Sequence, residues 1–250
     1  MTRTWPAINY DQWSATCDTL HAHTQVLGKL AVALALTPNR PVGEVTREVL
    51  DAAAGLGGRI KIDPTPQEVP WSVPLDEDRE HRTYDPNRVA DYFAAATQAA
   101  LVLAAFRAPY RGRSTPVNAW WGSFDLAVNL YSGRPADPPS TDFIMRNAMD
   151  AQEVALGWWP GDPNYAKAAF YAYAHPAPDD FAAATLPPSA TRWEEALGEY
   201  VLDWDDICRG HDPHGVALNF ARSAFRHSCA VCKWDPALPA SAESQPPPLH

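Results

Sequence analysis

The feature that most constrains how this chain can fold is the stretch from Ser114 to Arg134, S-T-P-V-N-A-W-W-G-S-F-D-L-A-V-N-L-Y-S-G-R. It has the pattern of two strands joined by a tight turn. With Gly122 and Ser123 at its centre, the turn has a glycine at the first central position, as in a type II′ hairpin. This turn predicts four cross-strand pairs: Trp121 with Phe124, Trp120 with Asp125, Ala119 with Leu126, and Asn118 with Ala127.

The predicted hairpin has two chemically different faces, because side chains alternate along a strand. One face is wholly apolar, and we predict that it forms a wall of the core: Val117, Ala119, Trp121, Phe124, Leu126, Val128 and Leu130. The other face mixes polar and aromatic side chains, and it is where we expect a ligand to bind: Asn118, Trp120, Asp125, Asn129 and Tyr131.

The composition is that of an ordinary globular protein, with 250 residues, 46% hydrophobic and 20% charged. The formal net charge of −10 argues against a nucleic-acid partner, because phosphate binding needs a basic surface. It also disfavours an anionic membrane surface. The sequence shows no secretory signal, and its longest apolar run, residues 99–106, is too short to cross a membrane. We therefore expect a cytoplasmic protein.

Apolar periodicity and turn residues predict the remaining elements. Helices are expected at 10–36, 42–55, 85–107, 144–154 and 213–232, and strands at 59–63, 168–175 and 198–204. The buried stripe of the third helix is predicted to comprise Val89, Phe93, Ala96, Ala100, Leu103 and Phe106. This irregular order of helices and strands predicts a single α+β domain over residues 5–234, with a mainly antiparallel sheet flanked by helices. A disordered Pro-rich tail is expected over 235–250.

Two further patterns place polar side chains together. In the strand at 168–175, Phe170, Ala172 and Ala174 face one way, and Tyr171, Tyr173 and His175 face the other. On the first helix a polar stripe recurs at helical spacing: Asp18, His21, Gln25 and Lys29. This stripe either lines a site or is a solvated helix face.

Cys208-x2-His211 and Cys229-x2-Cys232 have the spacing of a zinc site. The residues between the two pairs, however, predict a continuous helix over 213–228. Such a helix would hold the two pairs roughly 24 Å apart, whereas zinc ligands must lie within about 2.3 Å of one ion. The sequence therefore predicts no metal site.

No motif in the chain names a reaction or a cofactor. Asp125 is the most notable ionisable residue, because the hairpin places it beside two aromatic rings and two amides. If this face is covered, desolvation raises the pKa of Asp125 into the range of a general acid or base. The alternative is a half-buried structural aspartate that is hydrogen-bonded to its neighbours.

Several stretches resemble the signatures of an uncharacterised bacterial domain-of-unknown-function family. They are W-P-A-I-N-Y-D-Q-W (5–13), T-L-H-A-H-T-Q-V-L-G-K (19–29), D-E-D-R-E-H-R-T-Y-D-P (76–86), S-T-P-V-N-A-W-W-G-S-F-D-L-A-V (114–128), S-G-R (132–134), G-W-W-P-G (157–161) and A-F-Y-A-Y-A-H-P-A-P (169–178). The resemblance covers most of residues 5–235. It implies no reaction, cofactor or site residue, because the family is uncharacterised.

The chain departs from this family pattern in ways that bear on function. A β-rich block that typical members carry after the first helix is missing here. The resemblance implies a histidine where this chain has Asn118, an arginine near Leu130, and a His-Glu pair where it has Gln152 and Glu153. If those histidines form a site in the family, this member has lost much of it. An arginine near Leu130 also conflicts with placing that position on the apolar face.

Two hypotheses for function follow from these observations. The first is a pocket for an unknown small molecule, between one sheet face and the first helix. Its candidate catalytic residues are Asp125, His21 and His81, and its candidate ligand-binding residues are Asn118, Trp120, Tyr171, Tyr173 and Gln25. The second is a non-catalytic interaction protein, in which the missing block exposes a sheet edge or an apolar patch. Such an edge would be covered by a partner or by a second copy of the chain.

Overall fold

The computed structural model describes residues 5–6, 8–30, 36–57, 61–67 and 69–243, without the side chains of 21–30 and of residue 144. Six strands form one antiparallel sheet in the order β1-β2-β3-β4-β6-β5. Their bounds are β1 Asn118–Trp120, β2 Asp125–Pro135, β3 Ala151–Trp159, β4 Ala169–His175, β5 Arg192–Glu194 and β6 Glu199–Asp203. This confirms the predicted single α+β domain with an antiparallel sheet.

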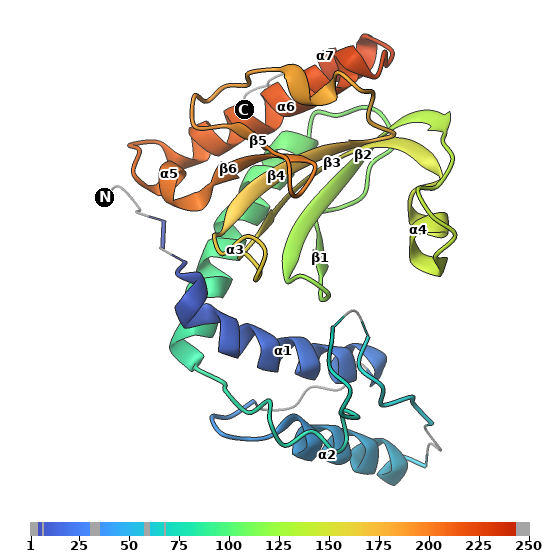
Figure 1. Ribbon diagram of the computed structural model, residues 1–250, viewed down its shortest axis with the longest axis vertical. Helices are drawn as coiled ribbons and strands as arrows, with labels where there is room; N and C mark the ends of the chain where they lie inside the picture. The colour runs from blue at the N-terminus through green and yellow to red at the C-terminus, as the bar shows by residue number, and fades with distance from the viewer. Residues whose placement is uncertain (1–4, 7, 31–35, 58–60, 68, 244–250) are drawn as a thin grey trace, which may run out of the picture.

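Within the described residues, seven α-helices and one 3₁₀ turn accompany the sheet (Figure 1). They are α1 Tyr10–Leu30, α2 Val42–Gly55, α3 Pro86–Arg107, α4 Phe143–Ala148, η1 Phe181–Ala183, α5 Trp204–Cys208, α6 Pro213–Val231 and α7 Ala237–Glu243. Asp85 caps the start of α3, since its carboxylate accepts a 2.8 Å hydrogen bond from the backbone N–H of Asn87.

One face of the sheet is the wall of the core. Leu126, Val128 and Leu130 of β2 are buried there, together with apolar residues of β3, β4 and β6. Helices α3 and α6 pack on this face, and Figure 1 shows α6 above the sheet and α3 running behind it. The pattern in β4 is as predicted, with Phe170, Ala172 and Ala174 in the core.

The opposite face of the sheet, here called the polar face, carries most of the ionisable side chains considered below. It comprises Asn118, Trp120, Asp125, Asn129, Tyr131, Glu153, Gly157, Tyr171, Tyr173, Glu199 and Asp203. A small apolar cluster of Ala127, Trp159, Ala169, Tyr171 and Val201 lies among them.

The hairpin register is confirmed, but its turn is not type II′. Asn118, Ala119 and Trp120 pair with Ala127, Leu126 and Asp125 as predicted. Residues 121–124 form a four-residue loop in which the left-handed residue is Phe124, with φ of 55°, and not Gly122. Because β1 is a short edge strand, Ala119 is exposed instead of buried.

The largest error of the sequence prediction concerns residues 144–154, which were expected to be helical. Helix α4 ends at Ala148, and β3 begins at Ala151 and is a central strand of the sheet. From Glu153 onward β3 is buried, so its sequence has no alternation of apolar and polar residues that would identify a strand.

Other boundaries also differ from the prediction. The sequence missed β5, and residues 61–63 of the expected strand at 59–63 are not in a strand, while 58–60 lie outside the described residues. The chain is helical over α7 and buries Ser241 and Ala242, so the domain extends beyond residue 234. The first predicted helix is described as far as Leu30.

Helix α3 is only partly a core helix. It buries Ala96, Leu103 and Phe106, as predicted, but Phe93 is 70% exposed and does not belong to the buried stripe. Among the described helices, α3 alone has the length and apolar composition of a membrane-crossing segment. That is weak evidence, because a helix packed against β2, β3 and α6 in a soluble protein meets the same criteria.

The first two helices pack on each other, and Trp13 of α1 contacts both α3 and the hairpin loop. Trp13 of α1 stacks on Tyr92 of α3, with ring centroids 4.7 Å apart, and meets the edge of Phe124 in the hairpin loop. Tyr92 in turn donates a 2.8 Å hydrogen bond to the carbonyl of Phe124. This contact fixes the hairpin loop between α1 and α3.

Candidate functional site

The polar face is centred on a hydrogen bond between two of the predicted site residues. The hydroxyl of Tyr171 on β4 donates to Oδ2 of Asp125 on β2, with an O–O distance of 2.5 Å. The bond crosses the intervening strand β3, where Gly157 pairs with both Tyr171 and Ala127. A Cβ at Gly157 would lie 2.2 Å from the Tyr171 ring, so only glycine lets the ring lie across β3.

Asp125 is held in a mostly dry environment, with 7% of its surface exposed. Burial raises its pKa, and hydrogen bonds from Ser123, from Tyr171 and from the backbone partly offset this effect. The Ser123 hydroxyl donates to Oδ1 at 2.5 Å, so each carboxylate oxygen has a hydroxyl donor. Asp125 is therefore a buried carboxylate whose two hydrogen-bonding hydroxyls orient it.

A second tyrosine extends this arrangement along β4. The rings of Tyr171 and Tyr173 are nearly parallel, with centroids 6.3 Å apart. Burial raises the pKa of Tyr173, and the charges of Glu153, Glu199 and Asp125 raise it further. The charges of three carboxylates, from strands β2, β3 and β6, therefore act on one tyrosine.

Glu199 is the member of this group that titrates nearest neutral pH. Burial, followed by the charge of Asp125, raises its pKa to about 7. It lies at the start of β6, next to the edge strand β5, and is partly accessible to solvent. Glu199 can therefore take up or release a proton at neutral pH, a requirement for a general acid or base.

Glu153 is more deeply buried than Glu199, with only 2% of its surface exposed. Burial raises its pKa, while interactions with Asn129, Tyr131 and Arg113 lower it. Its Oε2 atom has no hydrogen-bond partner within the described part of the chain. The guanidinium of Arg113 lies over the Tyr131 ring, 4.2 Å from its centroid.

A separate, fully paired carboxylate lies at the other end of the polar face. Asp203 accepts hydrogen bonds from the Tyr165 hydroxyl, from Lys167 Nζ at 2.9 Å and from Arg192 at 3.1 Å. Burial alone would raise the pKa of Asp203, but these hydrogen bonds outweigh it and lower the pKa. Asp203 is therefore a structural ion-pair centre.

The predicted residues of β1 share the polar face with Asp125. Trp120 pairs with Asp125 and Asn118 with Ala127, so both side chains project to the same side of the sheet. Trp120 is 48% exposed, and Asn118 is partly buried. Four predicted residues, Asn118, Trp120, Tyr171 and Tyr173, therefore lie on one face with Asp125.

His81 belongs to a different group of side chains, next to the start of α2. Its Nδ1 lies 2.7 Å from Oδ2 of Asp78, and its ring centroid lies 4.0 Å from that of Trp71. The charge of His81 also acts on Asp18 of α1. No described contact joins His81 to Asp125.

The backbone of the other two predicted residues, His21 and Gln25, is in α1, but their side chains lie outside the described residues.

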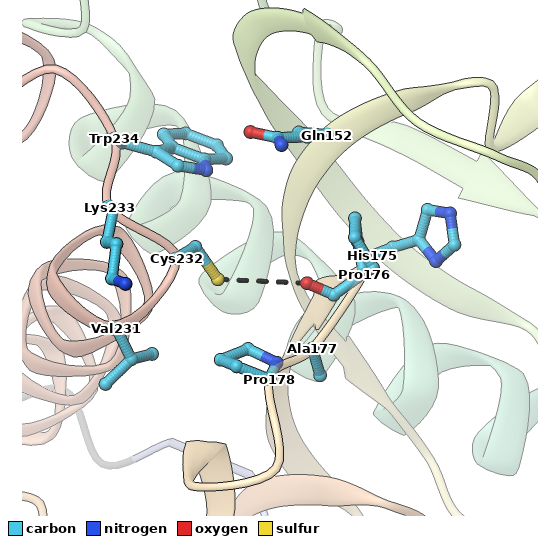
Figure 2. Close-up of a pocket in the computed structure, with 9 residues that line it drawn as sticks. All are labelled: Gln152, His175, Pro176, Ala177, Pro178, Val231, Cys232, Lys233 and Trp234. Atoms are coloured by element: carbon cyan, nitrogen blue, oxygen red, sulfur yellow. Dashed lines mark hydrogen bonds between the residues drawn. The ribbon is translucent and has the colours of Figure 1, made fainter.

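A hollow of about 360 Å³ lies elsewhere, where the end of β4 meets the end of α6 (Figure 2). In Figure 2, Gln152, Cys232 and Trp234 point toward the hollow, and the ring of His175 points away from it. The Cys232 thiol donates to the carbonyl of Pro176 at 3.9 Å. None of the predicted site residues lines this hollow, so it is distinct from the polar face.

The cysteines and histidine of the zinc-like motif lie at the two ends of α6. This helix runs unbroken from Pro213 to Val231, as predicted, with Cys208 before it and Cys229 and Cys232 at its far end. Across the described ranges, no three His, Cys, Asp or Glu side chains are arranged to hold a metal ion.

Three residues of the polar face were not predicted from the sequence as part of a site: Glu153, Gly157 and Glu199. Glu199 is the first residue of β6 and lies within the correctly predicted strand at 198–204, so its alternation with buried Tyr200 was available as a signal. Glu153 and Gly157 could not be placed, because β3 was expected to begin as a helix. The Tyr171–Asp125 contact depends on the pairing of β3 between β2 and β4, which no local pattern specifies.

Comparison with known proteins gives a match to a protein family. The model of a family described as a family of unknown function (DUF5996) matches residues 5–40 and 32–240, which together cover most of the chain. The two matches meet after α1, where the sequence analysis places the missing block. No curated protein and no solved structure matches significantly.

Proposed function

The chain belongs to this family of unknown function, and we propose that it binds a small molecule on the polar face of its sheet. The single observation that carries the proposal is the Tyr171–Asp125 hydrogen bond, which joins a buried carboxylate to a stack of two tyrosines. Mixed aromatic and polar surfaces with ionisable groups of shifted pKa are typical of small-molecule sites.

The chemistry that this face offers is proton transfer. Asp125 has a raised pKa and two hydroxyl partners, and Glu199 titrates near neutral pH. A ligand lying on Tyr173 would have a proton donor or acceptor on either side. Trp120, which is half-exposed on β1, offers an aromatic surface at the edge of the same face.

The test is a fragment screen by saturation-transfer NMR against four proteins: the wild type and the variants Asp125→Asn, Tyr173→Leu and Lys233→Ala. The last is a matched control, because Lys233 lines the hollow at the end of β4 and not the polar face. The proposal expects fragments that bind the wild type and the control but not the two polar-face variants. Fragments that are lost only in Lys233→Ala would overturn it, because they would occupy the hollow.

A second candidate function, an interaction protein, is favoured by the exposed side of α3. Phe93 is 70% exposed and Leu101 is 54% exposed, and their spacing of eight residues places them on one helix face. Strands β1 and β5 are the two edges of the sheet, at which a second copy could add a strand. Light scattering after size exclusion tests this function. It is supported if the wild type is an oligomer and the double variant Phe93→Glu/Leu101→Glu is a monomer. It is contradicted if the wild type is a monomer at all concentrations.

A further inference from the structure

The polar face carries three groups in which tyrosines lie beside carboxylates, and the chain itself supplies cations to the two outer groups. At one end Arg113 lies over Tyr131 and acts on Glu153. At the other end Lys167 and Arg192 bind Asp203, and Arg192 also lies 5.7 Å from the Tyr165 ring centroid.

The central group has the same chemistry without such a cation. It consists of Asp125, Tyr171, Tyr173 and Glu199. Within the part of the chain that the structure describes, no Lys, Arg or His forms an ion pair with Asp125 or Glu199. Asp125 accepts hydrogen bonds from the hydroxyls of Ser123 and Tyr171, and its charge acts on Glu199.

An independent observation also points to a hydrogen-bond donor that comes from outside the chain. Oε2 of Glu153 is buried and has no described partner, although buried carboxylate oxygens are normally hydrogen-bonded. Glu153 belongs to the group with Arg113, but its charge also acts on Tyr173, more strongly than that of Glu199. This unpartnered oxygen therefore belongs to a carboxylate whose charge acts on the central group.

We propose that this central group binds the protonated amine of a small molecule, with the ammonium on the face of Tyr173 and between the carboxylates of Asp125 and Glu199. The inference rests on the proposed function and specifies its ligand class. An ammonium group donates up to three hydrogen bonds and is attracted to the face of a tyrosine ring. Charge-assisted hydrogen bonds to carboxylates are among the strongest in proteins.

The negative charge of the site makes the binding of an anionic ligand unfavourable. An anion at the central group would meet the carboxylates of Asp125, Glu199 and Glu153, and the guanidinium of Arg113 that acts on Glu153 already lies over the Tyr131 ring. The net charge of −10 attracts cations and repels anions at long range as well.

The test measures binding of three probes of similar shape by isothermal titration calorimetry: 2-phenylethylamine, 2-phenylethanol and 3-phenylpropionate. We expect the amine to bind about tenfold more tightly than the alcohol, and the carboxylate to bind least. Glu199→Gln and Asp125→Asn keep the side-chain shapes and should each weaken the amine about tenfold, with little effect on the alcohol. Lys233→Ala should change none of the three.

The outcomes separate this inference from the proposed function. If the alcohol or the carboxylate binds as tightly as the amine, and Tyr173→Leu abolishes that binding, the face binds small molecules but has no preference for amines. If the amine does not bind the wild type, or binds equally well to Glu199→Gln and Asp125→Asn, the ligand class is wrong. Circular dichroism of each variant confirms that it is folded before titration.

Discussion

Gly157 on β3 and Tyr171 on β4 are cross-strand partners, and the tyrosine ring occupies the space that a side chain at Gly157 would fill. A Cβ there would lie 2.2 Å from Cζ of Tyr171 and 2.4 Å from its hydroxyl oxygen. The ring therefore crosses β3 and reaches Asp125 on β2. The contact between Tyr171 on β4 and Asp125 on β2 therefore depends on the glycine of the strand between them, Gly157 on β3.

The first prediction tests this dependence. Gly157→Ala should destabilise the protein by about 2–4 kcal/mol, because the ring must move and the buried hydrogen bond is lost. Urea denaturation measures the free energy of unfolding. Gly55→Ala at the end of α2 is the control, since nothing lies within 4 Å of its added Cβ, and it should stay within about 0.5 kcal/mol of the wild type. Equal stability of Gly157→Ala and the wild type would contradict the role of the glycine.

The second prediction concerns the hydroxyl of Tyr171. Tyr171→Phe leaves the ring in place but removes one donor from the buried Asp125 carboxylate, which should cost about 1–3 kcal/mol. Tyr173→Phe is the matched control, because its hydroxyl has no described hydrogen bond, and it should change stability by less than about 0.5 kcal/mol. The same urea titration at about pH 7 compares the two. Similar losses in both variants would show that the hydrogen bond contributes little.

The third prediction follows from the raised pKa of Glu199, about 7. Between the unfolded pKa, near 4.5, and about 7, the folded state binds more protons than the unfolded state, so stability falls as pH rises. The full effect is at most roughly 3 kcal/mol. The charged and titratable groups around Glu199 are Asp125, Tyr171, Tyr173 and its cross-strand partner Glu194, which pairs with Arg192.

Glu199→Gln should remove this decline while leaving stability at low pH nearly unchanged. Unfolding midpoints from about pH 4 to pH 8 measure the difference between variant and wild type. Parallel curves for the two proteins would mean that Glu199 ionises normally in the folded state.

The fourth prediction concerns Asp203, whose contribution to stability should change with pH in the opposite direction to that of Glu199. Although burial opposes ionisation of Asp203, its hydrogen bonds from Tyr165, Lys167 and Arg192 lower its pKa in the folded protein. Its contribution to stability is therefore present above the unfolded pKa, near 3.8, and is lost as pH falls through the folded pKa. Asp203→Asn should destabilise the protein at about pH 7 and have a much smaller effect at about pH 3. A loss that does not depend on pH would show that the cluster acts through packing alone.

The fifth prediction concerns the attachment of α1. Trp13→Ala removes a buried ring that stacks on Tyr92 and contacts Phe124, and it should cost about 3–5 kcal/mol. Hydrogen exchange should speed up in α1 and in the hairpin loop before it does in β3 and β4. Trp120→Ala, at a half-exposed edge position, is the control and should have little effect on either measurement. Uniform exchange across the sheet would mean that α1 does not unfold separately.

Local patterns identified many of the elements because the relevant signals are short-range. Asp85 and Pro86 mark the start of α3, and Asp212 and Pro213 mark the start of α6, because a carboxylate cap and a proline act within one helical turn. The alternation of β4 placed Tyr171 and Tyr173 opposite Phe170. Where a strand is buried on both faces, as β3 is, no such alternation exists, and a short helix was predicted instead.

By itself, the sequence determined the fold class, the starts of α1, α2, α3 and α6, the register of β1 on β2, and the membership of Asp125, Asn118 and Trp120 in one hairpin face. These follow from turn geometry and from the periods of helices and strands, which the order of residues alone specifies. Only the tertiary structure decided that Tyr171 meets Asp125 across Gly157, that Glu199 and Glu153 join them, and that His81 lies in another group. Those contacts depend on which strands are neighbours, and strand order is set by burial of the whole core against α3 and α6 and not by any local stretch.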